Sequence, residues 1–307
     1  METIRRQLAP QLEGRTIRRG WAFDSPKFTD APMASGHRIE ETGRRGKYLI
    51  INMSCTNPSD ADPNDAALDN TALKNTDSSG TDGLRAGRSA SGCAGVDRQL
   101  VVHLGMTGRL AVTDTPPQFL EDALRSGRHL RASWSFDDGT HLGFWDQRRF
   151  GRVALVEPGS YSGLPTLNAL GPEPFAPEFT GAALKKALSG RKAIKTALLD
   201  QRVVAGVGNI YADEALWIAG ISPTRRRLGA ARAADLRDAI VQVLGAGIED
   251  GGTTLRDYRD AAGDQGRHQE RLRCYGRSGL PCDRCGRPLS RKMVDARSTT
   301  WCRSCQT

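Results

Sequence analysis

Four cysteines near the C-terminus have the type and spacing of metal ligands. They are Cys282, Cys285, Cys302 and Cys305, two C-x2-C pairs with sixteen residues between them. Thiolates at this spacing are typical of a structural zinc site, and four of them leave no open coordination position for a reaction. The alternative is two disulfides, against which the lack of a secretory signal argues. The sequence therefore predicts one structural Zn2+ per chain.

The segment that carries these cysteines is strongly basic. Between residues 265 and 307 there are ten Arg or Lys residues and three acids, a net charge of +7, and the whole chain carries +9. A basic module that needs a metal to fold is typical of proteins that bind a polyanion such as nucleic acid. No apolar run reaches the length that spans a bilayer, so we expect no membrane partner and a cytoplasmic protein.

The elements that must position these residues differ between the two halves of the chain. A helix is expected over 2–12, where Ile4, Leu8 and Leu12 recur every four residues. Apolar, β-branched runs then predict strands at 47–51, 100–104, 131–136 and 141–145, the last two joined by an Asp-Gly hairpin turn at 137–140. Helical patterns follow at 181–188, 192–199, 209–218 and 230–248.

Composition predicts the domain organisation. Residues 55–98 contain almost no large apolar residue, which predicts a disordered insertion, and 157–178 are rich in Pro and Gly, which predicts a linker. We therefore expect an N-terminal domain over 1–156, a helical domain over 179–264 and a zinc module over 265–307. The other cysteines have no partner spacing and are expected to be free thiols: Cys55, Cys93 and Cys274.

A glycine-rich turn opens one of the predicted helices. Residues 203–208 read VVAGVG and lead into Asn209. Such a turn exposes backbone N–H groups at a helix start, which suit a phosphate, and Asn209 can add a side-chain donor. The alternative is a plain helix–helix corner, because a lone Gly-x-Gly turn is common.

Several segments taken together resemble the formamidopyrimidine-DNA glycosylase and endonuclease VIII family. Residues 201–220 (QRVVAGVGNIYADEALWIAG) resemble its helix–two-turn–helix motif, and 44–49 (RRGKYL) resemble its lysine strand. Two further segments, 103–108 (HLGMTG) and 146–151 (DQRRFG), resemble its DNA-probing loops; 2–6, 251–255 and the zinc finger complete the set. The resemblance covers nearly the whole chain apart from the insertion. It implies an α+β multidomain fold, with a helix-capped β-sandwich, a helix–two-turn–helix domain and a C-terminal zinc ribbon.

The resemblance also implies roles for single residues. Lys47 and Arg297 match family residues that bind phosphate near the lesion and assist strand cleavage. Met106, Arg148 and Phe150 match the family's triad that fills the space of an everted base, although on their own Met106 and Phe150 could be core residues. The remaining implied DNA contacts are His129, Arg191 and Asn209.

The implied function is base-excision repair. The closer match is to enzymes that remove oxidised purines (formamidopyrimidine, 8-oxoguanine) and then cleave the abasic site by β,δ-elimination. The implied partner is damaged double-stranded DNA. A monomer is the default expectation, located in the cytoplasm and associated with the nucleoid through DNA binding. No cofactor besides structural zinc is implied.

One family motif is not in this sequence. The family begins Met-Pro-Glu-Leu-Pro-Glu-Val-Glu-Thr, and its proline amine attacks the sugar with the adjacent glutamate as acid/base. This sequence begins Met1-Glu2-Thr3, which aligns Met1 with the family's valine. Either the true start lies upstream, because a GUG valine codon can be read as a start, or the chain is a non-catalytic DNA-damage-binding protein. A zinc-ribbon protein of translation or transcription is a third possibility, against which the loops at 103–108 and 146–151 argue.

Overall fold

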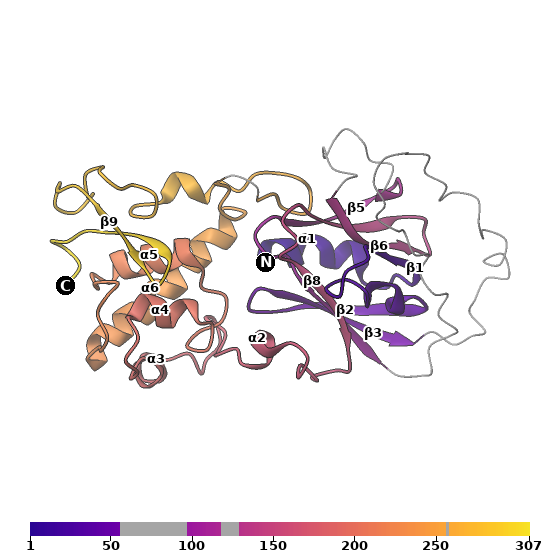
Figure 1. Ribbon diagram of the computed structural model, residues 1–307, viewed down its shortest axis with the longest axis horizontal. Helices are drawn as coiled ribbons and strands as arrows, with labels where there is room; N and C mark the ends of the chain where they lie inside the picture. The colour runs from indigo at the N-terminus through magenta and orange to yellow at the C-terminus, as the bar shows by residue number, and fades with distance from the viewer. Residues whose placement is uncertain (56–96, 118–128, 256–257) are drawn as a thin grey trace. The chain divides into compact units, whose positions relative to one another are not determined.

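The computed structural model describes residues 1–55, 97–117, 129–255 and 258–307 (Figure 1). These residues form two compact units. One comprises Ile4–Gly43 with Leu49–Ser160, and the other comprises Met1–Thr3, Arg44–Tyr48 and Tyr161–Thr307. The predicted insertion at 55–98 lies, apart from its ends, outside the described residues, and the domain boundaries drawn from composition stay a prediction.

The first unit contains two four-stranded sheets and a helix. One sheet has the order β1-β6-β7-β5 and the other β2-β3-β4-β8. The helix α1 (Glu2–Leu12) buries the predicted apolar stripe, with Ile4, Leu8 and Leu12 at most 1% exposed. This arrangement confirms the predicted helix-capped β-sandwich. The other elements are β1 (Ile17–Ala22), η1 (Ala31–Ala34), β2 (His37–Arg45), β3 (Tyr48–Cys55), β4 (Arg98–His103), β5 (Gly108–Thr113), β6 (Leu130–Phe136), β7 (His141–Asp146) and β8 (Arg152–Val156).

The β6–β7 hairpin confirms the turn read from the sequence. The strands are antiparallel, with Trp134 opposite Leu142. The N–H of Phe136 donates to the carbonyl of Thr140 at 2.9 Å, and Gly139 has a φ of 82°, the left-handed conformation that favours glycine. The Asp-Gly pair therefore closes this hairpin because the turn needs a residue with positive φ, and glycine supplies it.

The second unit is helical and ends in a two-stranded hairpin (Figure 1). The four predicted helices are confirmed. The second begins two residues later than expected, at Ile194, whose N–H donates to the carbonyl of Arg225 at 2.7 Å. No helix in the described part of the chain is long and apolar enough to cross a membrane. The elements are α2 (Pro165–Asn168), α3 (Gly181–Ala187), α4 (Ile194–Leu199), α5 (Asn209–Ile218), α6 (Ala230–Glu249), η6 (His268–Arg271), β9 (Ser290–Val294) and β10 (Arg297–Trp301).

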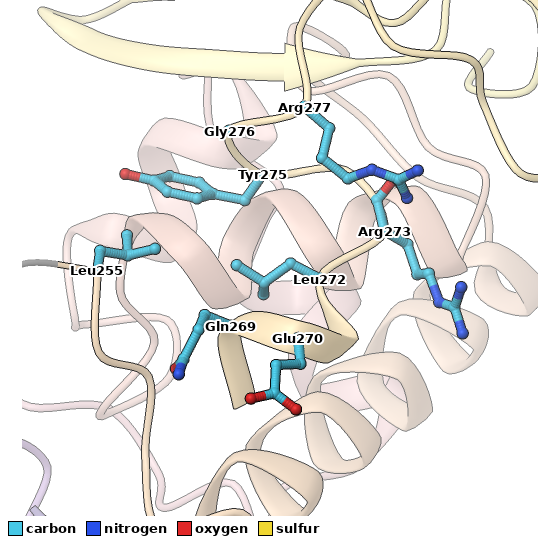
Figure 2. Close-up of a pocket in the computed structure, with 8 residues that line it drawn as sticks. All are labelled: Leu255, Gln269, Glu270, Leu272, Arg273, Tyr275, Gly276 and Arg277. Carbon is cyan, nitrogen blue, oxygen red and sulfur yellow. The ribbon is translucent and has the colours of Figure 1, made fainter. Parts of the chain in front are cut away.

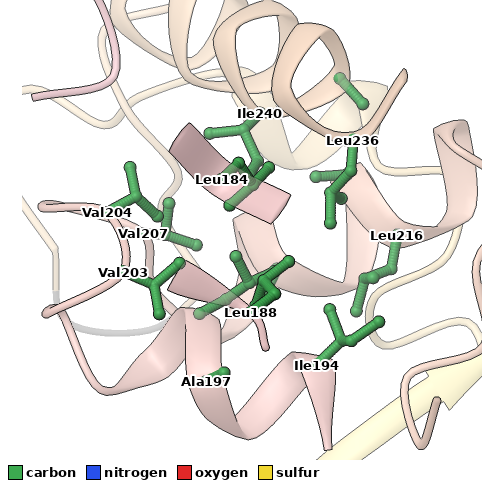
Figure 3. Close-up of a cluster of buried hydrophobic side chains, with 14 of the residues drawn as sticks. Leu184, Leu188, Ile194, Ala197, Val203, Val204, Val207, Leu216, Leu236 and Ile240 are labelled. Atoms are coloured by element: carbon green, nitrogen blue, oxygen red, sulfur yellow. The ribbon is translucent and has the colours of Figure 1, made fainter. Parts of the chain in front are cut away.

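The helices of this unit surround one apolar cluster (Figure 3). Leu184 of α3, Ile194 of α4, Leu216 of α5, and Leu236 and Ile240 of α6 are each at most 1% exposed. Burial of such side chains is the main favourable contribution to folding. This cluster therefore fixes how α4 and α5 lie against each other, which matters below because both helices carry polar residues of the site.

Replacing Leu216 with alanine should lower the free energy of unfolding by about 2–5 kcal/mol, because it leaves a cavity in this cluster. Leu280 is a matched control because it is 51% exposed, and Leu280→Ala should change the free energy by less than about 0.5 kcal/mol. Denaturant unfolding of the two zinc-loaded variants measures both values. Equal effects at the two positions would contradict the packing described here.

One prediction about cysteines is wrong. Cys55, at the end of β3, is disulfide-bonded, whereas a free thiol was expected. Its partner lies outside the described residues, as does Cys93. Cys274 is a free thiol, as predicted, and it is buried.

Candidate nucleic-acid interface and zinc site

The four C-terminal cysteines converge on one point. Their Sγ atoms all lie within 4.8 Å of one another, and those of Cys285 and Cys302 are 3.5 Å apart. Sulfur ligands of a tetrahedral zinc, at bonds of ~2.3 Å, lie ~3.8 Å apart, so the cluster fits that ion. All four thiols are free, which contradicts the disulfide alternative. The carbonyl of Cys282 accepts a hydrogen bond from the N–H of Gly286 at 2.8 Å, and the carbonyl of Cys302 accepts one from the N–H of Gln306 at 3.1 Å.

The zinc site is attached to the end of α5. The indole Nε1 of Trp217 donates to Cys282 Sγ at 3.4 Å, and both residues are buried. Arg284 donates to the carbonyls of Trp217 and Ile218, each at 2.7 Å, while its guanidinium carbon lies 4.2 Å from the centre of a Trp217 ring. A cation at the C-terminal end of a helix is favourable because the last carbonyls have no helical partner.

Lys47 lies at the opposite end of the same helix. Its Nζ donates to the carbonyl of Val207 at 3.2 Å, just ahead of α5. The helix is capped by Gly208, and a Cβ built there would lie 3.7 Å from the Lys47 Nζ. The first backbone N–H groups of a helix have no helical acceptor and carry partial positive charge. An ammonium beside such a helix start makes an anion site.

Two residues that the sequence analysis missed hold Lys47 and this turn. Gln201, at a φ of 63°, donates to the carbonyl of Val207 at 2.6 Å and accepts from Gly206 N–H at 2.9 Å. Glu173 accepts from the N–H of Gly46 at 2.6 Å and pairs with the side chains of Arg44 at 2.7 Å and Arg45 at 3.2 Å. Nothing in the sequence pairs Glu173 with Gly46, which lies 127 residues away.

Arg297 begins β10 and brings a second cation to Lys47. Burial and, secondly, the charge of Arg297 lower the pKa of Lys47 to about 8. Arg297 is exposed and follows a turn in which Asp295 and Ala296 have positive φ, 45° and 57°. Asn209, the first residue of α5, donates from Nδ2 to the carbonyl of Ser298 at 3.1 Å. The structure therefore brings together Lys47, Asn209 and Arg297, while Arg191 lies exposed between α3 and α4.

The predicted probing residues lie on two loops of the first unit. Met106 and Phe150 are 54% and 50% exposed, so the alternative that they are core residues is wrong. The guanidinium carbon of Arg148 lies 4.8 Å from the Phe150 ring centre. The backbones of the two loops approach each other closely at Gly105, where a Cβ atom would lie 2.8 Å from the backbone of Phe150. His129, half-buried, directly precedes β6.

A fully buried carboxylate ties these two loops together. Asp146, 0% exposed, accepts from the hydroxyl of Thr107 at 2.5 Å on one loop. On the other loop it accepts from the N–H of Gly151 at 2.7 Å and of Arg148 at 3.2 Å. The sequence shows Asp146 only as the first residue of a matched segment, so its role as the shared anchor emerges from the structure.

A pocket of about 450 Å³ lies elsewhere in the second unit (Figure 2). Arg273 and Arg277 at its rim both pair with Asp283 Oδ2, at 3.1 and 3.0 Å. None of the residues predicted to bind DNA or metal lines it. Its lining consists of Leu255, Gln269, Glu270, Leu272, Arg273, Tyr275, Gly276 and Arg277.

Family models match most of the chain. The formamidopyrimidine-DNA glycosylase N-terminal domain matches residues 1–153, and the H2TH domain of the same enzymes matches 170–259. A zinc finger found in FPG and IleRS matches 279–307. Formamidopyrimidine-DNA glycosylase of Deinococcus radiodurans is 35% identical over all of this chain and 95% of its own length.

The chain belongs to the formamidopyrimidine-DNA glycosylase family. Solved structures of the family agree in fold. MutM (FPG) of Thermus thermophilus is 36% identical with a TM-score of 0.77, covering 99% of this chain and 96% of that one. Lactococcus lactis Fpg bound to abasic-site DNA is 29% identical with a TM-score of 0.75, covering 100% and 97%. Together with the cysteine cluster, these matches confirm the predicted fold class and the structural zinc.

Proposed function

We propose that this protein removes oxidised purines from double-stranded DNA and cleaves the resulting abasic site by β,δ-elimination. The observation that carries the proposal is the convergence of Lys47, Asn209 and Arg297 at the start of α5, which suits a phosphate of the damaged strand. A relative from Lactococcus lactis has been solved in complex with abasic-site DNA, and a variant of it with DNA that contains Fapy-dG. Both complexes support this substrate class.

The cations at α5 would act on the phosphate backbone. An arginine fork binds phosphate in a bidentate manner, whereas Lys47 supplies a compact charge. Elimination at an abasic site releases a phosphate as leaving group, and positive groups fixed beside it stabilise the charge that develops there. Lys47 and Arg297 therefore fit a role in strand cleavage, with Asn209 and the helix start orienting the strand.

The exposed loops of the other unit would act on the base stack. A glycosylase must take its target base out of the duplex, and apolar side chains can fill the space that is left. Met106 and Phe150 are exposed apolar side chains on loops fixed by Asp146, and Arg148 offers a planar cation to the unpaired base. His129 and Arg191 would add contacts to the DNA backbone, which position the protein on the duplex without reading its base sequence.

The remaining finer features are proposals of the same kind. We expect a monomer that works in the cytoplasm at the nucleoid, with zinc as its only bound cofactor. The proposed domains are those predicted from the sequence composition. They are the sandwich at 1–156, a linker at 157–178, the helical domain at 179–264 and the zinc module at 265–307.

DNA binding should weaken as the pH rises through the pKa of Lys47, about 8. Only the ammonium form attracts phosphate, and that form is lost above this pH. If only the charged form binds, affinity falls about 10-fold between pH 7 and pH 9. Fluorescence anisotropy on an abasic-site duplex measures it. Lys47→Arg should remove this pH dependence, since arginine stays charged; an unchanged profile in that variant would contradict the assignment.

Analysis of reaction products tests the function. The chain is prepared as given and with Pro-Glu-Leu-Pro-Glu placed ahead of residue 1, and each is incubated with duplexes containing 8-oxoguanine, formamidopyrimidine or an undamaged guanine. We expect free oxidised base and 3′-phosphate ends from the extended chain, with none from undamaged DNA. If both chains bind damaged duplex and neither releases a base, the protein is a DNA-damage-binding protein and the catalytic proposal fails.

A further inference from the structure

A buried ion pair lies behind the strand that carries Arg297. Lys195 of α4 and Asp213 of α5 are 2.6 Å apart between Nζ and Oδ1, and their side chains are 0% and 1% exposed. Neither side chain can touch a ligand. Burying two charges is costly, and well-packed apolar residues of similar volume often replace such pairs without loss of stability. Packing alone therefore does not explain why this pair is charged.

The contacts of the pair explain it. Lys195 Nζ also donates to the carbonyl of Ser298 at 3.0 Å and to the hydroxyl of Thr299 at 2.8 Å. The other oxygen of Asp213 accepts from the N–H of Thr300 at 2.9 Å. The pair thus binds three consecutive residues of β10, and these residues directly follow Arg297.

These bonds meet a structural need of a two-stranded sheet. Among the strands that the structure describes, β10 pairs only with β9, so one of its edges lacks a strand partner there. Unpaired backbone groups at a buried edge must find other partners. The carbonyl of Ser298 and the N–H of Thr300 are such groups, and Lys195 and Asp213 supply a donor and an acceptor at the required places. Hydrogen bonds in which one partner is charged are shorter and stronger than neutral ones.

We propose that Lys195 and Asp213 are positioning residues, which hold β10 so that Arg297 is aimed at the phosphate beside Lys47. The inference rests on the proposed function, because it takes Arg297 as a phosphate ligand. Arg297 needs such support because the turn before it is exposed and the strand begins at Arg297 itself. The ion pair fixes the position of β10 through residues 298–300. The zinc site fixes the C-terminal end of the strand, where Trp301 precedes Cys302.

The salt dependence of DNA binding tests this proposal. Each phosphate contact contributes about 0.9 to the slope of log Kd against log salt concentration. Arg297→Ala should lower the slope by about that amount and weaken binding about 10-fold. Asp213→Asn should lower the slope similarly, although a residue that is 1% exposed cannot touch DNA. In the double variant we expect no further decrease, because both changes remove the same contact.

A matched control separates position from charge. Asp200 pairs with Lys192, also at 2.6 Å, but this pair is exposed, with 62% of Lys192 and 28% of Asp200 accessible. Asp200→Asn removes the same charge and should leave the slope unchanged. A second route uses Lys195→Met with Asp213→Leu, a neutral pair that preserves packing and should fold. It should reproduce the slope of Arg297→Ala, with the melting temperature confirming a folded protein.

The outcomes distinguish a failure of the positioning role from a failure of the proposed function on which it rests. If Arg297→Ala lowers the slope and Asp213→Asn and the neutral pair do not, the positioning role is wrong and the phosphate site stands. Additive losses in the Arg297→Ala/Asp213→Asn double variant would also overturn it, because the pair would then act elsewhere. If Arg297→Ala leaves the slope unchanged, Arg297 binds no phosphate, and the inference falls together with that part of the proposed function.

Discussion

Replacing Cys302 with serine should abolish zinc binding and weaken DNA binding on the order of 100-fold, about 2.7 kcal/mol. Cys302 is fully buried in a small apolar cluster whose other buried members are Trp217, Cys274, Cys282 and Leu289. Structural zinc contributes about 10–16 kcal/mol to the folding of zinc-finger peptides, so loss of one ligand should unfold the ribbon and release Arg297. Zinc content and anisotropy on damaged duplex measure the two effects.

Cys274 provides a matched control. It is as buried as Cys302 but lies outside the metal cluster, and its thiol donates to the carbonyl of Thr300 at 3.0 Å, a bond that a serine hydroxyl can keep. Cys274→Ser should retain one zinc per chain and bind DNA normally. If Cys302→Ser kept its zinc and its affinity for DNA, the assignment of a four-thiolate site would be wrong. If Cys274→Ser lost its zinc, the choice of these four cysteines as the ligands would be wrong.

Replacing Lys47 with alanine should slow strand cleavage at an abasic site by about 10²–10³-fold, the usual effect of removing one group that stabilises transition-state charge. Binding should weaken far less, about 10-fold, because Arg297 and the α5 start remain. Single-turnover cleavage rates at saturating protein separate the two effects. Lys185→Ala removes one lysine charge from the exposed face of α3 and should leave the cleavage rate unchanged. A rate loss shared equally by both variants would indicate general electrostatics instead of a specific site.

Some of this site could be predicted from local sequence. The zinc ligands follow from the spacing of four cysteines, because two short turns suffice to bring each pair to one ion. Helix α5 follows from its glycine-rich start, and the β6–β7 turn follows from Asp-Gly. The assignments of Lys47, Met106 and Arg297 depended on the family resemblance, since their residue types alone do not separate a ligand from a solvated or packed side chain.

The supporting contacts could not be predicted because they join distant segments. Lys192 and Lys195 illustrate the limit: they lie three residues apart, yet one side chain is 62% exposed and the other 0%. The difference is that Lys195 contacts Ser298 and Thr299 of β10, 103 and 104 residues further along the chain. Glu173 at Gly46 and the disulfide of Cys55 were missed for the same reason, since tertiary packing selects partners that no local period encodes.

Borohydride trapping tests the central claim most directly, namely that this family member carries out Schiff-base excision of oxidised purines. The chain, zinc-loaded, is incubated with an 8-oxoguanine duplex under borohydride, both as given and with Pro-Glu-Leu-Pro-Glu ahead of residue 1. We predict a covalent protein–DNA band for the extended chain, reduced strongly by Cys302→Ser. No band from either chain, with normal binding of the damaged duplex, would contradict the account and leave a protein that recognises damage without removing it.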